Sequence, residues 1–260
     1  MNYDFLLLFV AYHPSSHEVE VLKGCLNNLP TGSRYSLVAN EYREGEPLDT
    51  LIENANIFLP ITENIGYGSA VNRLVHAHDY IPKFMAVMNT DLSWEKGTFS
   101  TIISWLDSHQ DVTLAVPRIV DQYGNEQLLC KQNPTILALF SRRFVPTRLK
   151  PSWLKRYDNW YVMANQDYSQ IFDVPYLSGC CMFIRSSDFI KVGGFDEKYF
   201  LYLEDADITR KLSKHGRCIH LPITSIEHTW GRGNYQKLRL LIVNIVSGWI
   251  YFRKWGWAFW

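Results

Sequence analysis

The stretch Val87-Met88-Asn89-Thr90-Asp91 ends an apolar run that begins at Phe84. A short, continuous apolar run that stops at polar residues is typical of a strand buried on both faces of an α/β sheet. Open α/β sheets bind their ligands beyond the carboxyl ends of the strands, so we expect the Asp91 carboxylate at the ligand-binding edge. Asp91 is therefore the first candidate site residue.

Strands and helices alternate on both sides of this run. The predicted strands cover residues 3–12, 35–38, 56–59, 84–88 and 113–116. The predicted helices cover residues 16–29, with Ser16 as the capping residue, a segment that runs through His78, and residues 98–107. This alternation predicts an α/β fold with a mostly parallel central sheet flanked by helices.

Composition and charge limit the class of protein. The chain has 260 residues, of which 47% are hydrophobic and 20% charged, enough for one globular core. The formal net charge is zero, which argues against nucleic acid as a main partner. Five cysteines without a C-x-x-C spacing indicate a reducing cytoplasm.

Neither a signal peptide nor a membrane span is expected. Residues 1–10 have an apolar core but no leading basic residues and no small-residue cleavage site, so a first strand is favoured. No stretch reaches the roughly 18 apolar residues that a membrane span requires.

Two glycines, Gly66 and Gly68, follow the third predicted strand and precede a helix. Glycine lets the backbone approach a ligand closely, and the N-terminus of the following helix offers N–H groups to an anion. The same spacing fits a tight turn before a helix, and both interpretations stay open at this point.

Residues 127–173 interrupt the alternation. They contain prolines, aromatic residues and a basic cluster formed by Arg142, Arg143, Arg148 and Lys150. We expect either an irregular insertion near the acceptor side of the site or a packed surface segment with solvated charges.

A second acid cluster, Glu204-Asp205-Ala206-Asp207, begins a predicted helix. Acids are favoured in a first helical turn by the helix dipole, so plain capping competes with a catalytic role. Two short strands over residues 217–221 and 223–227 are expected after this helix, the second of which delivers His228.

These features form an ordered set between about residues 5 and 230. Its members are Asn64-x-Gly66-x-Gly68-x-x-x-Asn72, Asn89-Thr90-Asp91, Ser178-Gly179, Gly193-Gly194-Phe195-Asp196, Glu204-Asp205 and His228-x-Trp230. The set resembles the family 2 glycosyltransferases, particularly the bacterial rhamnosyltransferase and galactofuranosyltransferase group. The resemblance implies the GT-A fold, with a nucleotide-binding half over residues 1–117 and an acceptor-binding half over 118–231.

The resemblance also implies roles for single residues. Asp91 is expected to bind a divalent metal on the donor diphosphate, and His228 to complete the metal site. Asp205 is expected to be the catalytic base, with Glu204 beside it. The expected donor-binding residues are Tyr12, Asn40, Asn64, Gly66, Gly68, Asn72, Asn89, Asp91 and Gly179.

The chain departs from the family pattern at three positions. The usual Asp-x-Asp is Asn89-Thr90-Asp91 here, so only its last acid is retained. The second strand usually ends in Asp-Asn, and whether Asn40 or Glu41 takes over the nucleotide contact stays open. His13 stands where the family has Asn, and it either faces the nucleotide or ends the strand.

The chemistry fits these residue types. Transfer of a sugar from a nucleotide diphosphate needs stabilisation of the leaving group and removal of the acceptor proton. The carboxylate of Asp91 suits Mg²⁺ or Mn²⁺, and the imidazole of His228 favours Mn²⁺. A single base at Asp205, opposite the leaving group, predicts inversion at the anomeric carbon.

The resemblance favours an enzyme that transfers L-rhamnose from dTDP-rhamnose to a glycan or lipid-linked glycan of a bacterial surface polysaccharide such as O-antigen. Alternatives are a UDP-hexose donor, including galactofuranose, and a non-catalytic glycan-binding protein of the same fold. A sugar nucleotidyltransferase would need a basic, glycine-rich triphosphate loop, which residues 11–16 lack.

Residues 232–260 differ in kind from the rest. They contain basic residues but no acid, and apolar residues recur at helical spacing from Leu238 to Phe252. An amphipathic helix that ends in Trp255, Trp257 and Trp260 suits a membrane interface, here the inner face of the bacterial cytoplasmic membrane. Docking on the domain or pairing with a second copy in a homodimer are the alternatives.

Overall fold

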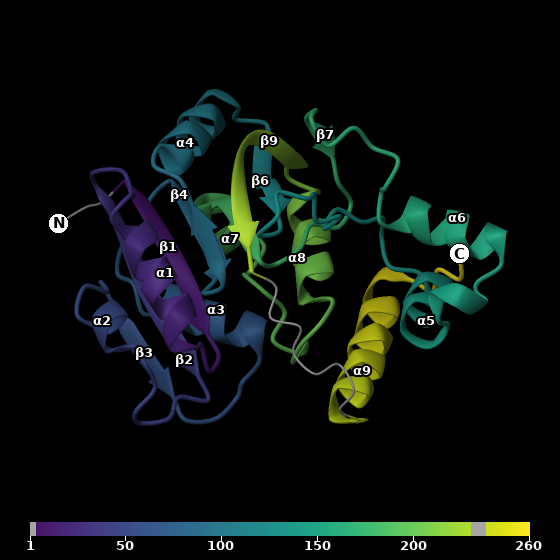
Figure 1. Cartoon of the computed structure of the whole chain (residues 1–260), viewed down its shortest axis with the longest axis horizontal. Helices are drawn as coiled ribbons and strands as arrows, with labels where there is room; N and C mark the ends of the chain where they lie inside the picture. The colour runs from purple at the N-terminus through teal and green to yellow at the C-terminus, as the bar shows by residue number, and fades with distance from the viewer. Residues whose placement is uncertain (1–3, 230–237) are drawn as a thin grey trace.

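The structure, a computed structural model, describes residues 4–229 and 238–260 around one central sheet (Figure 1). Its strands are β1 (Phe5–Ala11), β2 (Ser33–Asn40), β3 (Phe58–Ile61), β4 (Phe84–Asn89), β5 (Leu92–Trp94), β6 (Val112–Val120), β7 (Phe172–Asp173), β8 (Cys181–Arg185) and β9 (Arg217–His228). The strand order is β3-β2-β1-β4-β8-β6-β9-β5, and β7 pairs with β9. Trp230 and residues 232–237, which entered the sequence motifs, lie outside the described residues.

The N-terminal part of the sheet is parallel, as predicted. Strands β3, β2, β1 and β4 run in the same direction, with Val10 paired to Asn89 and Ala11 to Ala39. Every residue of β1 is buried, because helices cover both faces of a parallel sheet. This register brings the segments after Ala11, Asn40 and Asn89 to one edge of the sheet.

The second part of the sheet is mixed, because β6 and β9 pair in parallel whereas β8, β5 and β7 run antiparallel to their neighbours. Strand β8 runs antiparallel to both β4 and β6, and β5 runs antiparallel to β9. The pairing of Met88 with Cys181 leads to a hydrogen bond from the Asn89 N–H to the Cys180 carbonyl at 3.0 Å. The acid that follows β4 is thereby fixed next to the turn before β8.

The two strands predicted over residues 217–227 are one continuous strand, β9. Its register with β6 shifts where Pro117 pairs with Leu221 and Arg118 with Ser225. Pro222 lies in this shift, and it has no backbone N–H to donate to a ladder. The proline therefore produces a bulge rather than a break.

The helices are α1 (Ser16–Leu26), α2 (Asp49–Ile52), α3 (Tyr67–His76), α4 (Thr98–Ser108), α5 (Ile136–Phe144), α6 (Ser152–Tyr161), α7 (Ser186–Lys191), α8 (Glu204–Leu212) and α9 (Leu238–Trp255). A single 3₁₀ turn, η1 (Thr147–Leu149), lies between α5 and α6. Helix α1 is capped by Ser15 rather than by Ser16, because the side chains of Ser15 and Glu18 form a reciprocal capping box.

The expectation of an irregular segment over residues 127–173 is wrong for its middle, which forms α5 and α6. The Thr135 hydroxyl caps α5 by accepting a hydrogen bond from the Ala138 N–H at 3.1 Å. The buried Asp158 joins the two helices through the Ser141 hydroxyl and the Lys150 amine. The prolines delimit these helices rather than prevent them.

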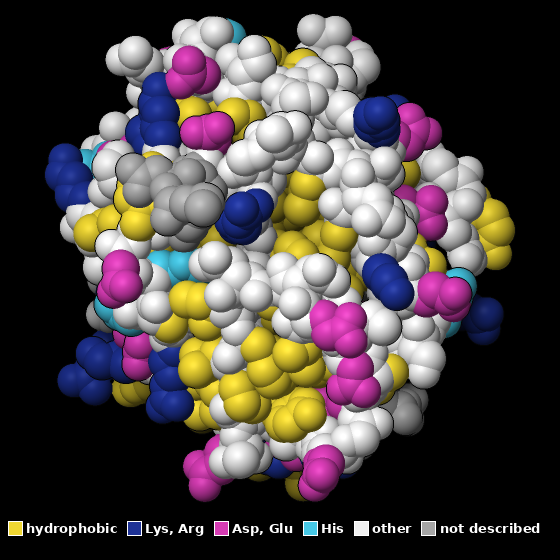
Figure 2. Space-filling view, turned by 90° about the vertical axis from the view of Figure 1, so that its left-hand side faces the viewer, with side chains coloured by type: hydrophobic (Ala, Val, Ile, Leu, Met, Phe, Trp, Pro, Cys, Tyr) yellow, Lys and Arg dark blue, Asp and Glu magenta, His cyan; other side chains and the backbone are white. Residues whose placement is uncertain are grey.

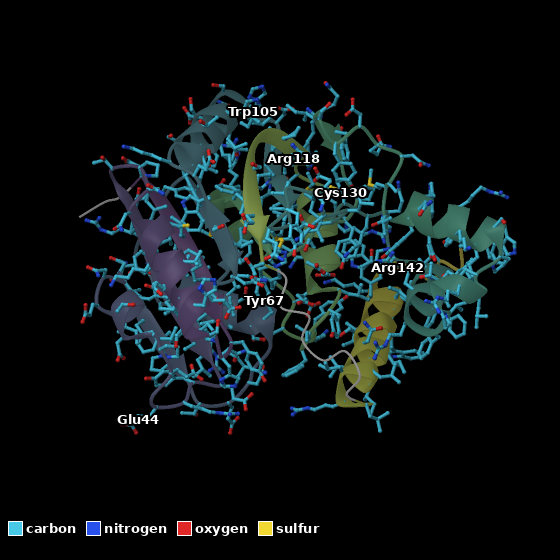
Figure 3. The ribbon with its side chains drawn as sticks, viewed as in Figure 1. Glu44, Tyr67, Trp105, Arg118, Cys130 and Arg142 are labelled. Carbon is cyan, nitrogen blue, oxygen red and sulfur yellow. The ribbon has the colours of Figure 1, made fainter. Side chains whose placement is uncertain are left out.

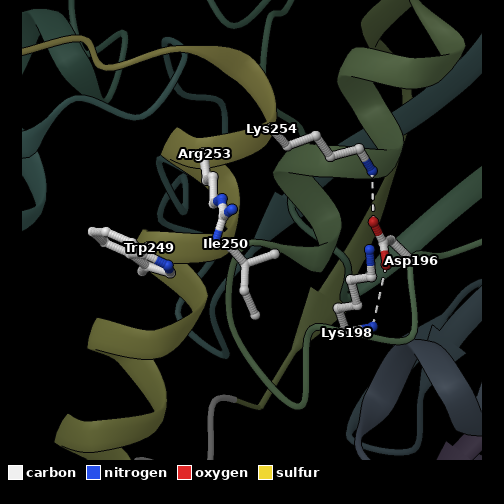
Figure 4. Close-up of a pocket in the computed structure, with 6 residues that line it drawn as sticks. All are labelled: Asp196, Lys198, Trp249, Ile250, Arg253 and Lys254. Atoms are coloured by element: carbon white, nitrogen blue, oxygen red, sulfur yellow. Dashed lines mark hydrogen bonds and ion pairs between the residues drawn. The ribbon is translucent and has the colours of Figure 1, made fainter.

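One face of α9 docks on the domain. Ser247, Gly248, Tyr251 and Phe252 are buried, and Tyr251 and Phe252 belong to a core cluster with Tyr199, Leu203 and Ala206. At the end of α9, Lys254 reaches Asp196 at 2.8 Å across a cavity of about 540 Å³ (Figure 4). The buried Asp207 on α8 accepts from Lys254 and from the Trp255 indole. Helix α9 is thus fixed to the helix that carries the second acid cluster.

Strand β3 is the outermost strand on one side of the sheet. Figure 2 shows this side of the molecule, where hydrophobic side chains gather beside Asp and Glu side chains. Pro60 is exposed within β3, and a proline cannot donate a hydrogen bond to an added strand.

In the described parts of the chain, every helix is too short or too polar to cross a bilayer.

Candidate active site

Asp91 and His228 meet at the carboxyl edge of the sheet. Asp91 follows β4, and His228 is the last residue of β9, which is held beside it by the pairing of Leu92 with His228. The His228 Nε2 atom lies 3.2 Å from Asp91 Oδ2, and both side chains are mostly buried. The structure therefore brings together the two residues predicted to hold a metal.

Gln127 requires a proton on one ring nitrogen of this histidine. The Gln127 Nε2 donates to the His228 carbonyl at 2.9 Å, so Gln127 Oε1 faces His228 Nδ1 at 3.0 Å. Because Oε1 can only accept, Nδ1 carries a proton. In the neutral imidazole, the Nε2 lone pair then points at the Asp91 carboxylate.

This arrangement suits a cation. Two hydrogen-bond acceptors 3.2 Å apart repel each other unless a proton or a metal ion lies between them. Asp91 Oδ1 is also buried without a hydrogen-bond partner among the described residues. Because the described residues contain no cluster of three or more His, Cys, Asp or Glu side chains suited to a metal, a bound ion would need further ligands from substrate or water.

The base candidate, Asp205, lies in the first turn of α8 and is partly exposed. Its Oδ2 accepts a hydrogen bond from the Gly179 N–H at 3.2 Å. A Cβ at position 179 would stand 3.3 Å from the Asp205 Cβ, so glycine permits this approach. The Gly179 carbonyl in turn accepts from the Tyr67 hydroxyl at 2.8 Å.

Glu204 differs from its neighbour in exposure. Its side chain is buried, and Glu204 Oε2 has no hydrogen-bond partner among the described residues. Burial, together with the charge of Asp205, raises the pKa of Glu204 well above its ordinary value. Glu204 is therefore protonated at neutral pH, and Asp205 is the member of the pair that can reach a substrate.

The charges of Asp91 and Asp205 both influence the pKa of one buried thiol, that of Cys180. Burial raises the pKa of the Cys180 thiol to about 12, and the charges of Asp91 and Asp205 contribute in the same direction.

Tyr202 and Leu203, directly before α8, both adopt positive φ, a conformation that costs a non-glycine residue about 1–3 kcal/mol. Such strain is concentrated at functional sites.

The predicted donor loop is held by two asparagines. Asn40 is buried, donates to the Asn64 side chain at 3.0 Å and accepts from the Ile65 N–H at 3.0 Å. Asn64 also accepts from the Gly66 N–H at 3.0 Å. The amide groups of both asparagines shape the loop that enters α3.

The glycines of this loop approach the chain itself rather than open space. A Cβ at Gly66 would stand 2.2 Å from the Phe200 carbonyl oxygen, and one at Gly68 would stand 2.8 Å from the Phe195 Cβ. Asn72 contacts the same segment. Its Nδ2 donates a hydrogen bond to the Phe195 carbonyl, and its Oδ1 accepts one from the Phe195 N–H. The two glycines thus make room for residues 195–200, while the donor-binding role expected for this loop stays a prediction.

The ends of β1 and β2 form a polar cluster. The exposed Tyr12 donates to Glu41 Oε2 at 3.1 Å, and His13 Nδ1 lies 2.5 Å from Glu46 Oε1. His13 and Glu41 both have positive φ, which turns the chain at each strand end. Of the two candidates after β2, Glu41 faces this cluster, whereas Asn40 faces the Asn64 loop.

Known sugar transferases are similar to this chain in sequence. Residues 161–231 match a family profile described as the N-terminal domain of galactosyltransferase. The N-acetylglucosaminyl-diphospho-decaprenol L-rhamnosyltransferase of Mycobacterium tuberculosis is 27% identical over 232 residues, which cover 84% of this chain and 74% of the relative.

Solved structures share the fold. GalNAc-T7 with UDP, GalNAc and Mn²⁺ gives a TM-score of 0.63 at 11% identity, covering 88% of this chain and 44% of that one. The mannosyltransferase PcManGT of Pyrobaculum calidifontis, with GDP-Man and Mn²⁺, gives 0.60 at 13% identity, covering 96% and 65%. The chain is a glycosyltransferase of the GT-A fold. The predicted resemblance to family 2 and to its bacterial rhamnosyltransferases is confirmed.

This glycosyltransferase spans less than two thirds of either solved chain. Its site includes residues that the sequence did not indicate. Gln127 fell in the segment without a predicted role, and Tyr67 was only one residue of the glycine loop. No local motif marks them, because their partners His228 and Gly179 are 101 and 112 residues away in the sequence.

Proposed function

We propose that the glycosyltransferase moves L-rhamnose from dTDP-rhamnose to a hydroxyl of a lipid-linked glycan, with inversion at the anomeric carbon. The observation that carries the proposal is the similarity in sequence to a relative named as an L-rhamnosyltransferase of N-acetylglucosaminyl-diphospho-decaprenol. A UDP-hexose donor is the alternative, since one of the solved neighbours was crystallised with UDP.

The Asp91–His228 pair is proposed to hold a divalent metal, Mn²⁺ or Mg²⁺, on the donor diphosphate. The approach of His228 Nε2 to Asp91 Oδ2 and the absence of a partner for Asp91 Oδ1 among the described residues support this assignment, as does Mn²⁺ in both solved neighbours. When bound, the ion would stabilise the negative charge of the leaving nucleotide. Gln127 orients His228 for this task.

Asp205 is proposed to remove the proton from the acceptor hydroxyl. The Gly179 N–H holds its carboxylate, and the protonated Glu204 leaves a single negative charge on the pair. A base on one side of the sugar and a leaving group on the other give inversion. Asn89 and Gly179 are proposed to border the donor, with Asn40, Asn64, Gly66, Gly68 and Asn72 shaping the loop beneath it.

Nucleotide recognition is proposed for the ends of β1 and β2. Tyr12 offers an exposed ring, and Glu41 is the acid beside it. The halves over residues 1–117 and 118–231 are proposed to bind donor and acceptor respectively, within one sheet.

The enzyme is further proposed to bind the inner face of the bacterial cytoplasmic membrane through α9. The face of α9 opposite the docked one exposes Leu238, Ile242, Ile245, Val246 and Trp249. These positions recur at helical spacing and form one stripe, which we call the α9 stripe. A second copy of the chain is the alternative occupant of this stripe.

The donor is tested by thermal unfolding with dTDP, UDP and GDP, each with and without Mn²⁺, for the wild type and His228→Ala. Ligand at a hundredfold above its dissociation constant stabilises a protein by about 2.7 kcal/mol. We expect a metal-dependent shift with dTDP that is lost in the variant. A shift with UDP alone would support the alternative donor, and no shift with any nucleotide would contradict the proposal.

A further inference from the structure

A second cavity, of about 370 Å³, lies beside the residues that precede α8. It is lined by α5, by α9 and by the residues before α8, and three of its lining side chains are cations: Lys131, Arg142 and Arg143. In Figure 3, Arg142 of α5 is labelled near α9, and Tyr67 is labelled on the other side of α8. Among the described residues that line the cavity, none is acidic.

Two of these cations are held by aromatic rings rather than by carboxylates. The Lys131 Nζ lies 4.3 Å from the centre of the Tyr176 ring, and the Arg142 guanidinium carbon lies 5.8 Å from that of Tyr161. Among the ion pairs within residues 4–229 and 238–260, none includes Lys131 or Arg142. Removal from solvent lowers the pKa of Lys131, an effect that Asp205 opposes and Arg142 increases. Cations in such surroundings are stabilised by a bound anion.

The cavity adjoins the proposed catalytic base. Tyr202 and Leu203 line it and directly precede Glu204 and Asp205. If the anionic group of a ligand occupies the cavity, the part of the ligand attached to that group would therefore lie near Asp205.

The same cavity opens between two helices with exposed apolar side chains. Leu240 and Asn244 of α9 line it, on the side of this helix away from the α9 stripe. On α5, Phe140 and Phe144 are about half exposed, on the helix that also supplies the lining residue Arg142. An anionic group in the cavity can thus be attached to an apolar chain that leaves along α5.

We propose that this cavity binds the diphosphate group of a lipid-linked acceptor, which places the first sugar at Asp205 and the lipid chain along α5. The inference rests on the proposed function and names the acceptor class. A planar Arg fork and the point charge of Lys131 match the several oxygens and charges of a diphosphate. The site is distinct from the Asp91–His228 pair, so its ligand needs no metal.

The test is binding of farnesyl diphosphate to the full chain in EDTA, measured by titration calorimetry, with farnesol and inorganic diphosphate as comparison probes. We expect Lys131→Gln and Arg142→Gln each to weaken binding of farnesyl diphosphate about tenfold or more. Lys131→Arg and Arg142→Lys, which keep the charge, should retain most of it. Arg156→Gln removes an exposed cation of α6 outside the cavity and should change nothing.

Inorganic diphosphate should bind more weakly than farnesyl diphosphate but with the same dependence on Lys131 and Arg142. Equal binding by wild type and both Gln variants, equal binding of farnesol, or no binding by the wild type would overturn the inference. Nucleotide binding with Mn²⁺ is measured separately in the same proteins. If the wild type does not bind a nucleotide in the presence of Mn²⁺, the proposed function is contradicted. The result with farnesyl diphosphate in EDTA would still decide the assignment of the cavity.

Discussion

His228 Nε2 lies 3.2 Å from Asp91 Oδ2, although 137 positions separate the two residues in the chain. Strand β5, which follows Asp91, runs antiparallel to the end of β9 and aligns them. The histidine has only one ring nitrogen left for a ligand, because Gln127 occupies the other. The metal function of the pair therefore depends on a residue outside it.

Gln127→Leu should lower the affinity for Mn²⁺ in the presence of dTDP by about 10- to 100-fold. The change removes the acceptor for His228 Nδ1 and frees the ring to turn or to change tautomer. The measurement is a Mn²⁺ titration of nucleotide-induced thermal stabilisation. Gln166→Leu, at an exposed position, is the matched control. Unchanged Mn²⁺ affinity in a folded Gln127→Leu protein would refute the positioning role.

Asp91→Asn and Asp205→Asn should remove activity by different routes. Asp91→Asn is expected to abolish metal-dependent nucleotide binding, since it takes away the anionic metal ligand. Asp205→Asn is expected to leave nucleotide binding intact and to lower turnover by at least about 10²-fold, because a positioned base is lost. Thermal shift with dTDP and a sugar-transfer assay on both variants separate the two effects. Equal loss of metal binding in both would argue against the assignment.

Glu204 should make the protein less stable as the pH rises. Its folded-state pKa lies above the ordinary value of 4.5, so between these two values the folded state holds a proton that the unfolded state releases. In that window, the free energy of unfolding falls by at most about 1.4 kcal/mol per pH unit. Glu204→Gln cannot ionise and should remove this slope in thermal unfolding between about pH 4 and about pH 9.

The control for this pH profile is Glu53→Gln, which changes an exposed acid. Its profile should follow that of the wild type. If Glu204→Gln also follows the wild type, Glu204 is ionised at neutral pH and the burial argument fails.

Ile245→Ser combined with Trp249→Ser should weaken binding to vesicles that contain anionic lipid. Both side chains are more than half exposed on the α9 stripe, so their replacement costs little stability. Co-sedimentation with the vesicles measures the change, and Tyr123→Ser, at an exposed site near the end of β6, is the control. Equal sedimentation of all three proteins would favour the homodimer alternative, which gel filtration then examines.

The local sequence was sufficient to predict most of the helices and strands and to propose a set of site residues. The apolar run before Asn89 predicted β4, and the acids after Leu203 predicted the start of α8, because burial and helix-dipole effects act over a few residues. The same locality explains the errors. Residues 127–173 have little periodicity, so α5 and α6 became evident only from the caps and from the buried Asp158 between them.

Tertiary structure decided which residues act together. The sequence by itself identified Asp91, Asp205 and His228 as candidates, but only the antiparallel pairing of β5 with β9 joins Asp91 to His228. Tertiary structure also gave two adjacent acids different properties, since burial favours the protonated form of Glu204 while Asp205 is partly exposed. Likewise, Gln127 and Lys131 acquire their roles from partners far along the chain. Contacts of this kind depend on strand order and register, which no short stretch of sequence encodes.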